Sequence, residues 1–358
     1  MAKRIFNDEQ ILKHFEKRVW LCLPEMSEIK SFIQLILESL TKRKVEVAST
    51  VAAAAPHRLE KLAKDHCWSI FKQRAFVDVE VPEEIVIMEN RIVEMCQGVP
   101  LAASVLGGLL CNKEKHEWLT ILDGNTLVAG EDDNGENSIR KILKLSYDYL
   151  PSPHLKKCFA YFAMFPKDFE FEKDQLIQLW MAEGFLHPCQ EITVMEVIGN
   201  KFFQLLLRNS LLQDVKLDEH NNITHCKMHD LVHDLAGDIL KSKLFDPRGD
   251  GGENLSQVRY FGWDSPSDQI YKINEPGNLC TLFWKSNYIL EDMLLSFKFL
   301  RVLNLSSSGI KELSAKIGKL IYLRYLDLPD TNITALPHSD KTKSISSARD
   351  YFPPLMED

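Results

Sequence analysis

Two seven-residue words near the C-terminus recur with the same pattern of leucines. FLRVLNL spans residues 299–305 and YLRYLDL spans residues 322–328, a spacing of 23 residues. Each word is followed by a polar turn and an I-x-x-L element. A period of about 20–29 residues with this leucine pattern is typical of leucine-rich repeats, whose parallel strands stack into a solenoid. The chain is therefore predicted to contain the start of such an array.

The limits of this array are read from the surrounding residues. LCTLFW at 279–284 is predicted to be a degenerate earlier strand, and residues 246–256 form a linker rich in Gly and Asp. Two clear repeats are fewer than the roughly three that a free-standing solenoid needs. We place the repeats at 246–340 and treat residues 341–358 as an unpatterned tail.

The N-terminal part opens like an α/β domain. Residues 18–24 are predicted to be a buried strand ended by a proline, and residues 27–40 carry the apolar stripe of an amphipathic helix. No further convincing strand follows before residue 80. Since a sheet needs more than one strand, residues 1–56 are predicted to be a remnant of an α/β domain.

Helices dominate the middle of the chain. Residues 58–76 and 83–96 are predicted to be helical, and a turn beginning at Gly98 leads into a helix that ends near Leu110. Residues 123–137 are rich in Gly, Asp and Asn, which predicts an exposed loop or a domain boundary. A helical subdomain is therefore expected at 57–130.

The next part combines helices with a hairpin. Helices are predicted from Ser138 to Leu186, at 196–209 and from about Met228, and two strands at 211–216 and 222–227 flank a turn. The aromatic residues between Phe159 and Trp180 are expected to be core. This order indicates a winged-helix subdomain at 131–245. The fold class is thus mainly α, with an α/β remnant, helical and winged-helix subdomains, and the start of a leucine-rich repeat solenoid.

Composition restricts the location and the partners. The formal net charge is −8, so nucleic-acid binding is not expected. None of the eight cysteines forms a C-x-x-C pair, which is typical of reduced thiols in a cytoplasmic protein. The first residues lack the apolar core of a signal peptide. The most apolar run, 99–110, is too short to cross a bilayer, so no membrane segment is expected.

Several words, in this order, resemble the nucleotide-binding (NB-ARC) region of plant NLR disease-resistance proteins of the coiled-coil class. The resemblance covers about residues 5–337 with one internal gap, and the fourth and fifth words are the most specific. The words are IFNDEQILKHFEKRVWLCLPE at 5–25, HRLEKLAKDHCWSIFKQRAF at 57–76, GVPLA at 98–102, KLSYDYLPSPHLKKCFAYFAMFPKDFEFEKDQLIQLWMAEGFL at 144–186 and MHDLVHDLA at 228–236.

The resemblance implies a switch that ADP holds closed and ATP opens. It places Pro100 of the word starting at Gly98 against adenine, and His229 of the Met228–His229–Asp230 motif against the β-phosphate of ADP. A helix N-terminus is a suitable place for a phosphate. Other interpretations remain open. Gly98 and Pro100 can simply separate two helices, and His229 can be a solvent-facing residue.

Two features of the family are missing from the sequence. No glycine precedes Gly98, and no G-x-x-x-x-G-K-[ST] phosphate loop occurs. The acidic strand that handles Mg²⁺ in the family is absent between Leu40 and Val45. We therefore expect no enzyme activity and weak or absent ADP/ATP binding. The expected role is a defence-related interaction module or relic, with intact NLR relatives or pathogen-derived or guarded proteins as partners.

Two other function classes use the same helix. The residues from His225 to Asp234 include several His, Cys and Asp. A zinc site or a metal-dependent HD-type hydrolase is therefore an alternative interpretation of this segment. Neither H-E-x-x-H nor C-x-x-C supports that alternative, so no metal site is predicted. A winged helix can also bind DNA, but polar residues predicted to face outward, Asp230, Asp234 and Asp238 among them, would repel phosphate.

Overall fold

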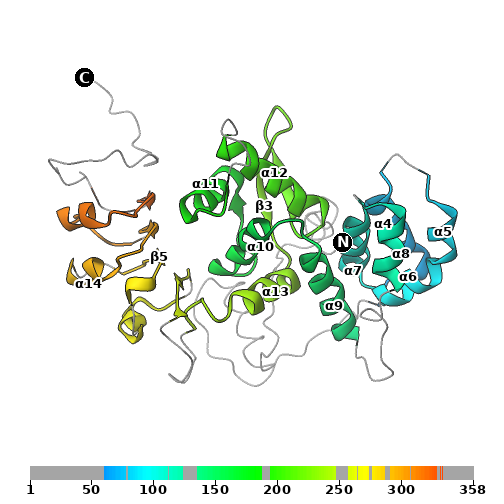
Figure 1. Cartoon of the computed structure of the whole chain (residues 1–358), viewed down its shortest axis with the longest axis horizontal. Coiled ribbons are helices and arrows are strands. Elements are labelled where there is room, and N and C mark those ends of the chain that lie inside the picture. The colour runs from blue at the N-terminus through cyan, green and yellow to red at the C-terminus, as the bar shows by residue number, and fades with distance from the viewer. Residues whose placement is uncertain are drawn as a thin grey trace, which may run out of the picture. The chain divides into compact units, whose positions relative to one another are not determined.

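A computed structural model (Figure 1) divides the chain into two compact units, Met1–Glu60 and Lys61–Asp358, and the elements below all belong to the second. The predicted strand at 18–24, the helix at 27–40 and the tail at 341–358 lie outside the described residues. The predicted subdomain boundaries at 56, 130, 245 and 340 stay predictions. The structure describes residues 60–77, 80–111, 113–123, 135–187, 194–246, 257–263, 265–273, 276–286, 291–306, 308–328, 331 and 333.

The first helices form a small bundle. In the predicted helix 58–76, the first helical residue is Lys64, because the Leu62 N–H donates to the Gly98 carbonyl at 2.9 Å and holds residue 62 outside the helix. The predicted helix 83–96 is broken at Met88. The bundle comprises α4 (Lys64–Ala75), α5 (Glu83–Ile87), α6 (Glu89–Cys96), α7 (Pro100–Leu110) and α8 (Lys115–Asp123).

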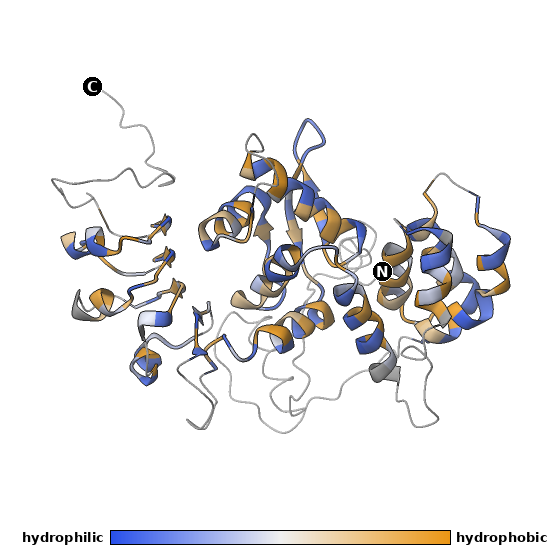
Figure 2. Cartoon of the chain, in the orientation of Figure 1, coloured by the Kyte–Doolittle hydropathy of each residue, from blue (hydrophilic) through white to orange (hydrophobic). Residues whose placement is uncertain are grey.

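The winged-helix part follows. The predicted loop 123–137 is shorter, because α9 already begins at Gly135. The fold is mainly helical, as predicted, and Figure 2 shows hydrophobic and hydrophilic residues sharing α9 and α13. The helices are α9 (Gly135–Asp148), α10 (Pro153–Ala160), the 3₁₀ turn η2 (Tyr161–Met164), α11 (Lys173–Glu183), α12 (Met195–Arg208) and α13 (Asp230–Leu240).

A three-stranded antiparallel sheet forms the wing. The predicted hairpin is confirmed as β2 (Gln213–Leu217) and β3 (Ile223–Lys227). A third strand that was not predicted, β1 (Phe171–Glu172), pairs with β3 through Phe171 and Cys226. The aromatic residues predicted to be core are largely buried, with Phe159, Phe162 and Trp180 fully enclosed.

Four parallel strands begin the repeats. Their order is β4 (Tyr260–Phe261), β5 (Thr281–Phe283), β6 (Val302–Asn304) and β7 (Tyr325–Asp327), with short helical turns η4 (Ser267–Lys272), η5 (Pro276–Asn278), α14 (Glu291–Ser296) and η6 (Ala315–Lys319) between them. The degenerate strand predicted at 279–284 is thus confirmed as β5. Strand β4, only two residues long, was not predicted.

The two faces of this parallel sheet bury different residues. Leu282, Leu303 and Leu326 lie in the repeat core. Val302 and Tyr325 belong instead to the core of the winged-helix part, on the opposite face, where α11 contacts β6 and β7. The repeats therefore do not stand alone, since one face of their sheet is completed by the winged helix.

Candidate functional site: the Gly98 turn and the start of helix α13

The turn at Gly98 has a conformation that favours glycine. Gly98 has φ +74°, and a Cβ built on it would lie 2.7 Å from the Lys61 Cβ and 3.0 Å from the Leu62 carbonyl oxygen. Its carbonyl accepts the Leu62 N–H. The absence of a side chain thus lets the segment before α4 approach the turn closely.

Pro100 begins α7. It is the first helical residue, where a missing N–H leaves no intrahelical bond unmade. The residue is exposed, so a ligand ring could pack against it. Gly98 and Pro100 thus do separate α6 from α7, and this structural role is compatible with a ligand contact.

The motif Met228–His229–Asp230 forms the start of α13. Met228 is buried at 3% exposure, and Asp230 is the first helical residue. His229 is the N-cap, since its Nδ1 accepts the Leu231 N–H at 3.2 Å. The helix predicted from Met228 begins two residues later because His229 adopts an extended conformation.

The environment of His229 keeps the ring neutral. Burial lowers its pKa below the usual histidine value, while the carboxylates of Asp230, Asp234 and Asp214 act in the opposite direction. The interpretation of His229 as solvent-facing is therefore wrong, because the ring is half-buried and caps a helix.

Helix α9 connects the two halves of the candidate site. It packs against α6 and α7 on one side and against α13 on the other. Gln97, beside the turn, donates from Nε2 to the Ser138 hydroxyl of α9 at 3.2 Å. The residues expected to contact a nucleotide thus lie on elements that share a neighbour.

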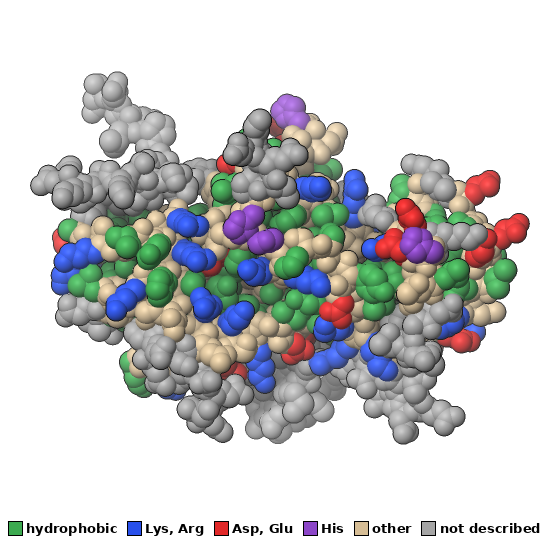
Figure 3. All heavy atoms as spheres, viewed as in Figure 1, with side chains coloured by type: hydrophobic (Ala, Val, Ile, Leu, Met, Phe, Trp, Pro, Cys, Tyr) green, Lys and Arg blue, Asp and Glu red, His purple; other side chains and the backbone are tan. Residues whose placement is uncertain are grey.

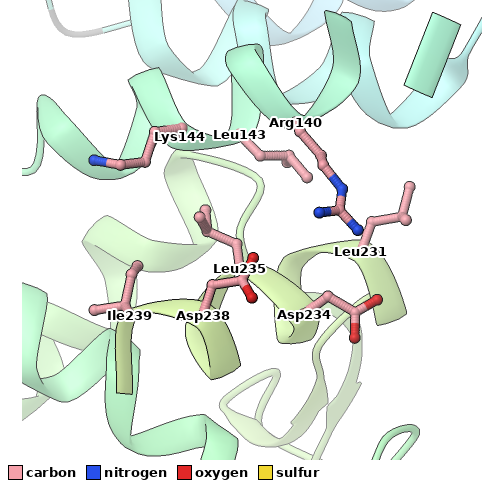
Figure 4. Close-up of a pocket in the computed structure, with 8 residues that line it drawn as sticks. All are labelled: Arg140, Leu143, Lys144, Leu231, Asp234, Leu235, Asp238 and Ile239. Carbon is pink, nitrogen blue, oxygen red and sulfur yellow. The ribbon is translucent and has the colours of Figure 1, made fainter. Parts of the chain in front are cut away.

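A pocket of about 400 Å³ lies between α9 and α13. In Figure 4 the side chains of Arg140 and Leu143 extend from one helix and that of Leu235 from the other into the space between them. Half of the eight lining side chains are aliphatic, and the charged ones are basic on α9 and acidic on α13. The lining residues are Arg140, Leu143, Lys144, Leu231, Asp234, Leu235, Asp238 and Ile239. Gly98, Pro100 and His229 are not among them, although Leu231 is the residue that His229 caps.

The pocket was not foreseen from the sequence, although its walls have a recognisable pattern. Arg140, Leu143 and Lys144 follow helical spacing, as do Leu231, Asp234, Leu235 and Asp238. Two charges are already paired, because Asp234 lies 2.5 Å from the Lys167 ammonium and Lys144 pairs with Asp148. Such a pocket can take an apolar group flanked by polar ones.

Comparison with known proteins now identifies the family. The model of the winged-helix domain of disease resistance proteins matches residues 164–236. The disease resistance protein RGA2 of Solanum bulbocastanum is 30% identical over 384 aligned residues, which cover 90% of this chain and 37% of the relative. An RPP13-like disease resistance protein of Arabidopsis thaliana is 33% identical over 325 residues, 84% of this chain and 29% of the relative. The chain belongs to the plant disease resistance proteins of the NLR type.

The alignment with the Solanum relative also bears on the internal gap. Its 384 positions exceed the 358 residues of the whole chain, so it steps over positions that this NLR sequence lacks. The chain spans 37% of that relative, so the activity of the whole receptor is not carried over to it. Over the part that the structure describes, no helix is long and apolar enough to cross a membrane.

The alternative metal centre of an HD-type hydrolase gains no support from the geometry. The His233 Nε2 lies 2.8 Å from the Phe165 carbonyl oxygen, and Cys226 is fully buried in the core. Among the residues that the structure describes, no three His, Cys, Asp or Glu side chains gather into a group that could hold a metal ion. The histidines of this NLR helix make local contacts instead.

The polar residues predicted to face outward on α13 are mostly half-buried. His233 contacts Phe165, and Asp234 is paired with Lys167. Of this set, Asp238 is the exposed one. That prediction was therefore wrong for His229, Asp230, His233 and Asp234, because α9 and η2 pack over this helix.

We expect His229→Ala to lower the free energy of unfolding by about 1 kcal/mol, the usual cost of losing an N-cap. The Leu231 N–H would lose its acceptor. His229→Asn should restore most of the stability, because asparagine is a favoured N-cap. Urea unfolding of the three proteins measures this, and equal stability of wild type and the alanine variant would contradict the capping role.

Proposed function

We propose that this NLR chain serves plant defence as a non-enzymatic interaction module in the cytoplasm, or is an inactive relic of one. The observation that carries the proposal is that two of the three nucleotide-contact residues expected from the family, Gly98 and His229, have partners within the chain. The Gly98 carbonyl accepts from Leu62, and the His229 Nδ1 accepts from Leu231. Both groups contribute to folding whether or not a nucleotide is bound.

The internal gap supports the same proposal. The sequence lacks the family's acidic strand between Leu40 and Val45, and the long alignment with the Solanum relative requires skipped positions. Without carboxylates to hold Mg²⁺ and orient water, phosphate-transfer chemistry has no centre.

An exposed apolar surface suits a protein partner. Ile321 is 79% exposed, and the neighbouring rings of Phe299 and Tyr322 lie 5.7 Å apart at the surface of the repeats. Figure 3 shows hydrophobic side chains next to Lys and Arg on one face of the molecule. Exposed hydrophobic groups beside charges are typical of protein interaction surfaces. The partner would be an intact NLR relative, or a pathogen-derived or guarded protein.

The nucleotide content of the purified chain tests the proposal. Protein shown to be folded by circular dichroism is denatured, and the released nucleotide is quantified by chromatography. We expect far less than one ADP or ATP per chain. Near-stoichiometric nucleotide would overturn the proposal, and ATP hydrolysis above a boiled control would overturn its non-enzymatic part.

An ADP-binding switch is the second candidate. It is favoured by the exposed ring of Pro100 and by the neutral His229 at the start of α13, where backbone N–H groups attract phosphate. His229→Ala and His229→Asn separate the two roles of the ring. If His229 contacts phosphate, both variants lose nucleotide, whereas a purely capping role leaves the asparagine variant equal to wild type.

A further inference from the structure

Two histidines that are far apart in sequence meet on the winged-helix part. His154 is the second residue of α10, and His187 follows the end of α11. Their ring centroids are 4.6 Å apart, and the ring planes are inclined by 58°. His187 is exposed and His154 is half-buried, so the pair lies at the surface with one ring directed into the fold.

One ring nitrogen of His154 lacks a partner. Its Nδ1 is buried and makes no hydrogen bond within the described residues. That nitrogen is therefore available to an ion.

A buried imidazole nitrogen without a partner can serve as a metal ligand, because zinc is commonly bound by histidine nitrogens. An unpaired buried nitrogen is costly unless something binds it.

The distance between the rings suits a shared ion. With metal–nitrogen bonds of about 2.0–2.1 Å and a tetrahedral angle, two ligating imidazoles have centroids roughly 5 Å apart. The observed 4.6 Å is within reach of that geometry through a small rotation of the exposed His187 ring. Solvent on the His187 side can supply the remaining ligands as water.

We propose that His154 and His187 form a binding site for a divalent transition-metal ion of the Zn²⁺ type, completed by water. The ion would tie the start of α10 to the segment after α11. With two protein ligands, the site is expected to bind more weakly than a closed structural site with four.

Zinc titration of the full chain tests the site. The reduced protein is freed of metal with a chelator, and Zn²⁺ binding is measured by calorimetry and by the shift of the thermal midpoint. We expect His154→Ala and His187→Ala each to weaken the tightest Zn²⁺ binding by about tenfold or more, since even the loss of an outer-shell partner costs 10–100-fold. His220→Ala is the control, because His220 is exposed on the β2–β3 turn.

A second measurement distinguishes this site from the other histidines and the cysteines. His187→Cys keeps a zinc ligand at the same place, so it should retain binding that His187→Ala loses. Equal affinity and stoichiometry in wild type and both alanine variants would overturn the proposal. So would an anomalous-scattering signal from Zn²⁺ in crystals at any position other than between these two rings.

Discussion

Glu183→Lys is expected to lower the free energy of unfolding by about 3–5 kcal/mol, the usual cost of an uncompensated buried charge. Glu183 is the last residue of α11 and is 1% exposed. Its carboxylate accepts from the Thr281 hydroxyl and lies 3.7 Å from the Arg301 guanidinium. A lysine there would face Arg301, Arg324 and Arg259 without a counter-charge.

The measurement is urea unfolding followed by circular dichroism, with a charge swap as the second variant. Combining Glu183→Lys with Arg301→Glu should recover part of the lost stability, because the pair is reversed rather than broken. Arg301 also donates to the Glu183 backbone carbonyl at 2.5 Å, so recovery should be incomplete. A Glu183→Lys variant as stable as wild type would show that the contact between α11 and the repeats does not contribute to folding.

Glu183 also gives the chain a pH dependence of known sign. Burial raises its pKa to about 6, and the Thr281 hydrogen bond and the arginines only partly offset this. Because the folded pKa lies above the unfolded value, the favourable contribution is complete below about pH 4.5 and is lost as the pH rises through 6. Titration of Glu183 should therefore lower the free energy of unfolding of wild type by about 2 kcal/mol between pH 4.5 and 7.5.

Glu183→Gln is the matched control for the pH dependence. Its uncharged amide resembles the protonated acid, so this variant should lack the loss between pH 4.5 and 7.5 and should be at least as stable as wild type at pH 7.5. Urea unfolding at the two pH values compares the proteins. If the free energy of unfolding changed with pH equally in wild type and Glu183→Gln, a group other than Glu183 would be responsible for the pH dependence.

Gly108→Ala should lower the free energy of unfolding by about 2–3 kcal/mol, which is in the upper range for overpacking a tight core. A Cβ at Gly108 would lie 2.6 Å from the Arg208 carbonyl oxygen and 2.9 Å from the Asn209 Cα. Both are backbone atoms, so no side chain can move aside. Helix α7 and the end of α12 would have to separate.

Gly237→Ala provides the comparison within another helix. Nothing lies within 4 Å of a Cβ built at Gly237, in α13. Alanine is favoured over glycine inside a helix by about 1 kcal/mol, so this variant should be stabilised. Thermal unfolding of both variants measures the difference. A destabilised Gly237→Ala, or a neutral Gly108→Ala, would contradict the packing of these two helices.

The elements with strong local patterns were predicted well from the sequence. The helix at 196–209 and the hairpin around residues 218–221 have clear periodicity and a polar turn, and the structure has both within one or two residues. The repeat strands were harder, because the 23-residue step from Val302 to Tyr325 shortens to 21 between Thr281 and Val302. A two-residue strand such as β4 has too few residues to show alternation.

The errors arose where distant residues decide local structure. The helix predicted from residue 58 begins later because Leu62 bonds to Gly98. Likewise, the polar face of α13 was expected to be exposed, but α9 and η2 pack over it. The motif around His229 was recognised from the sequence alone. Its capping role and the adjacent pocket were not, because both depend on tertiary packing. The nucleotide contacts of Gly98, Pro100 and His229 stay predictions.

The fastening of α11 to the repeats has a mechanical consequence. Arg301, just before β6, donates to the Glu183 carbonyl, and Arg324, just before β7, donates to the Ala182 carbonyl. Two successive repeats are therefore bonded to the same end of α11. Gln175, one helix length earlier, bonds to Asp327 on the last described strand. A helix bonded to the sheet at both ends stiffens it. Any bending or unwinding of the solenoid at β6 and β7 must therefore tilt α11 or break those bonds.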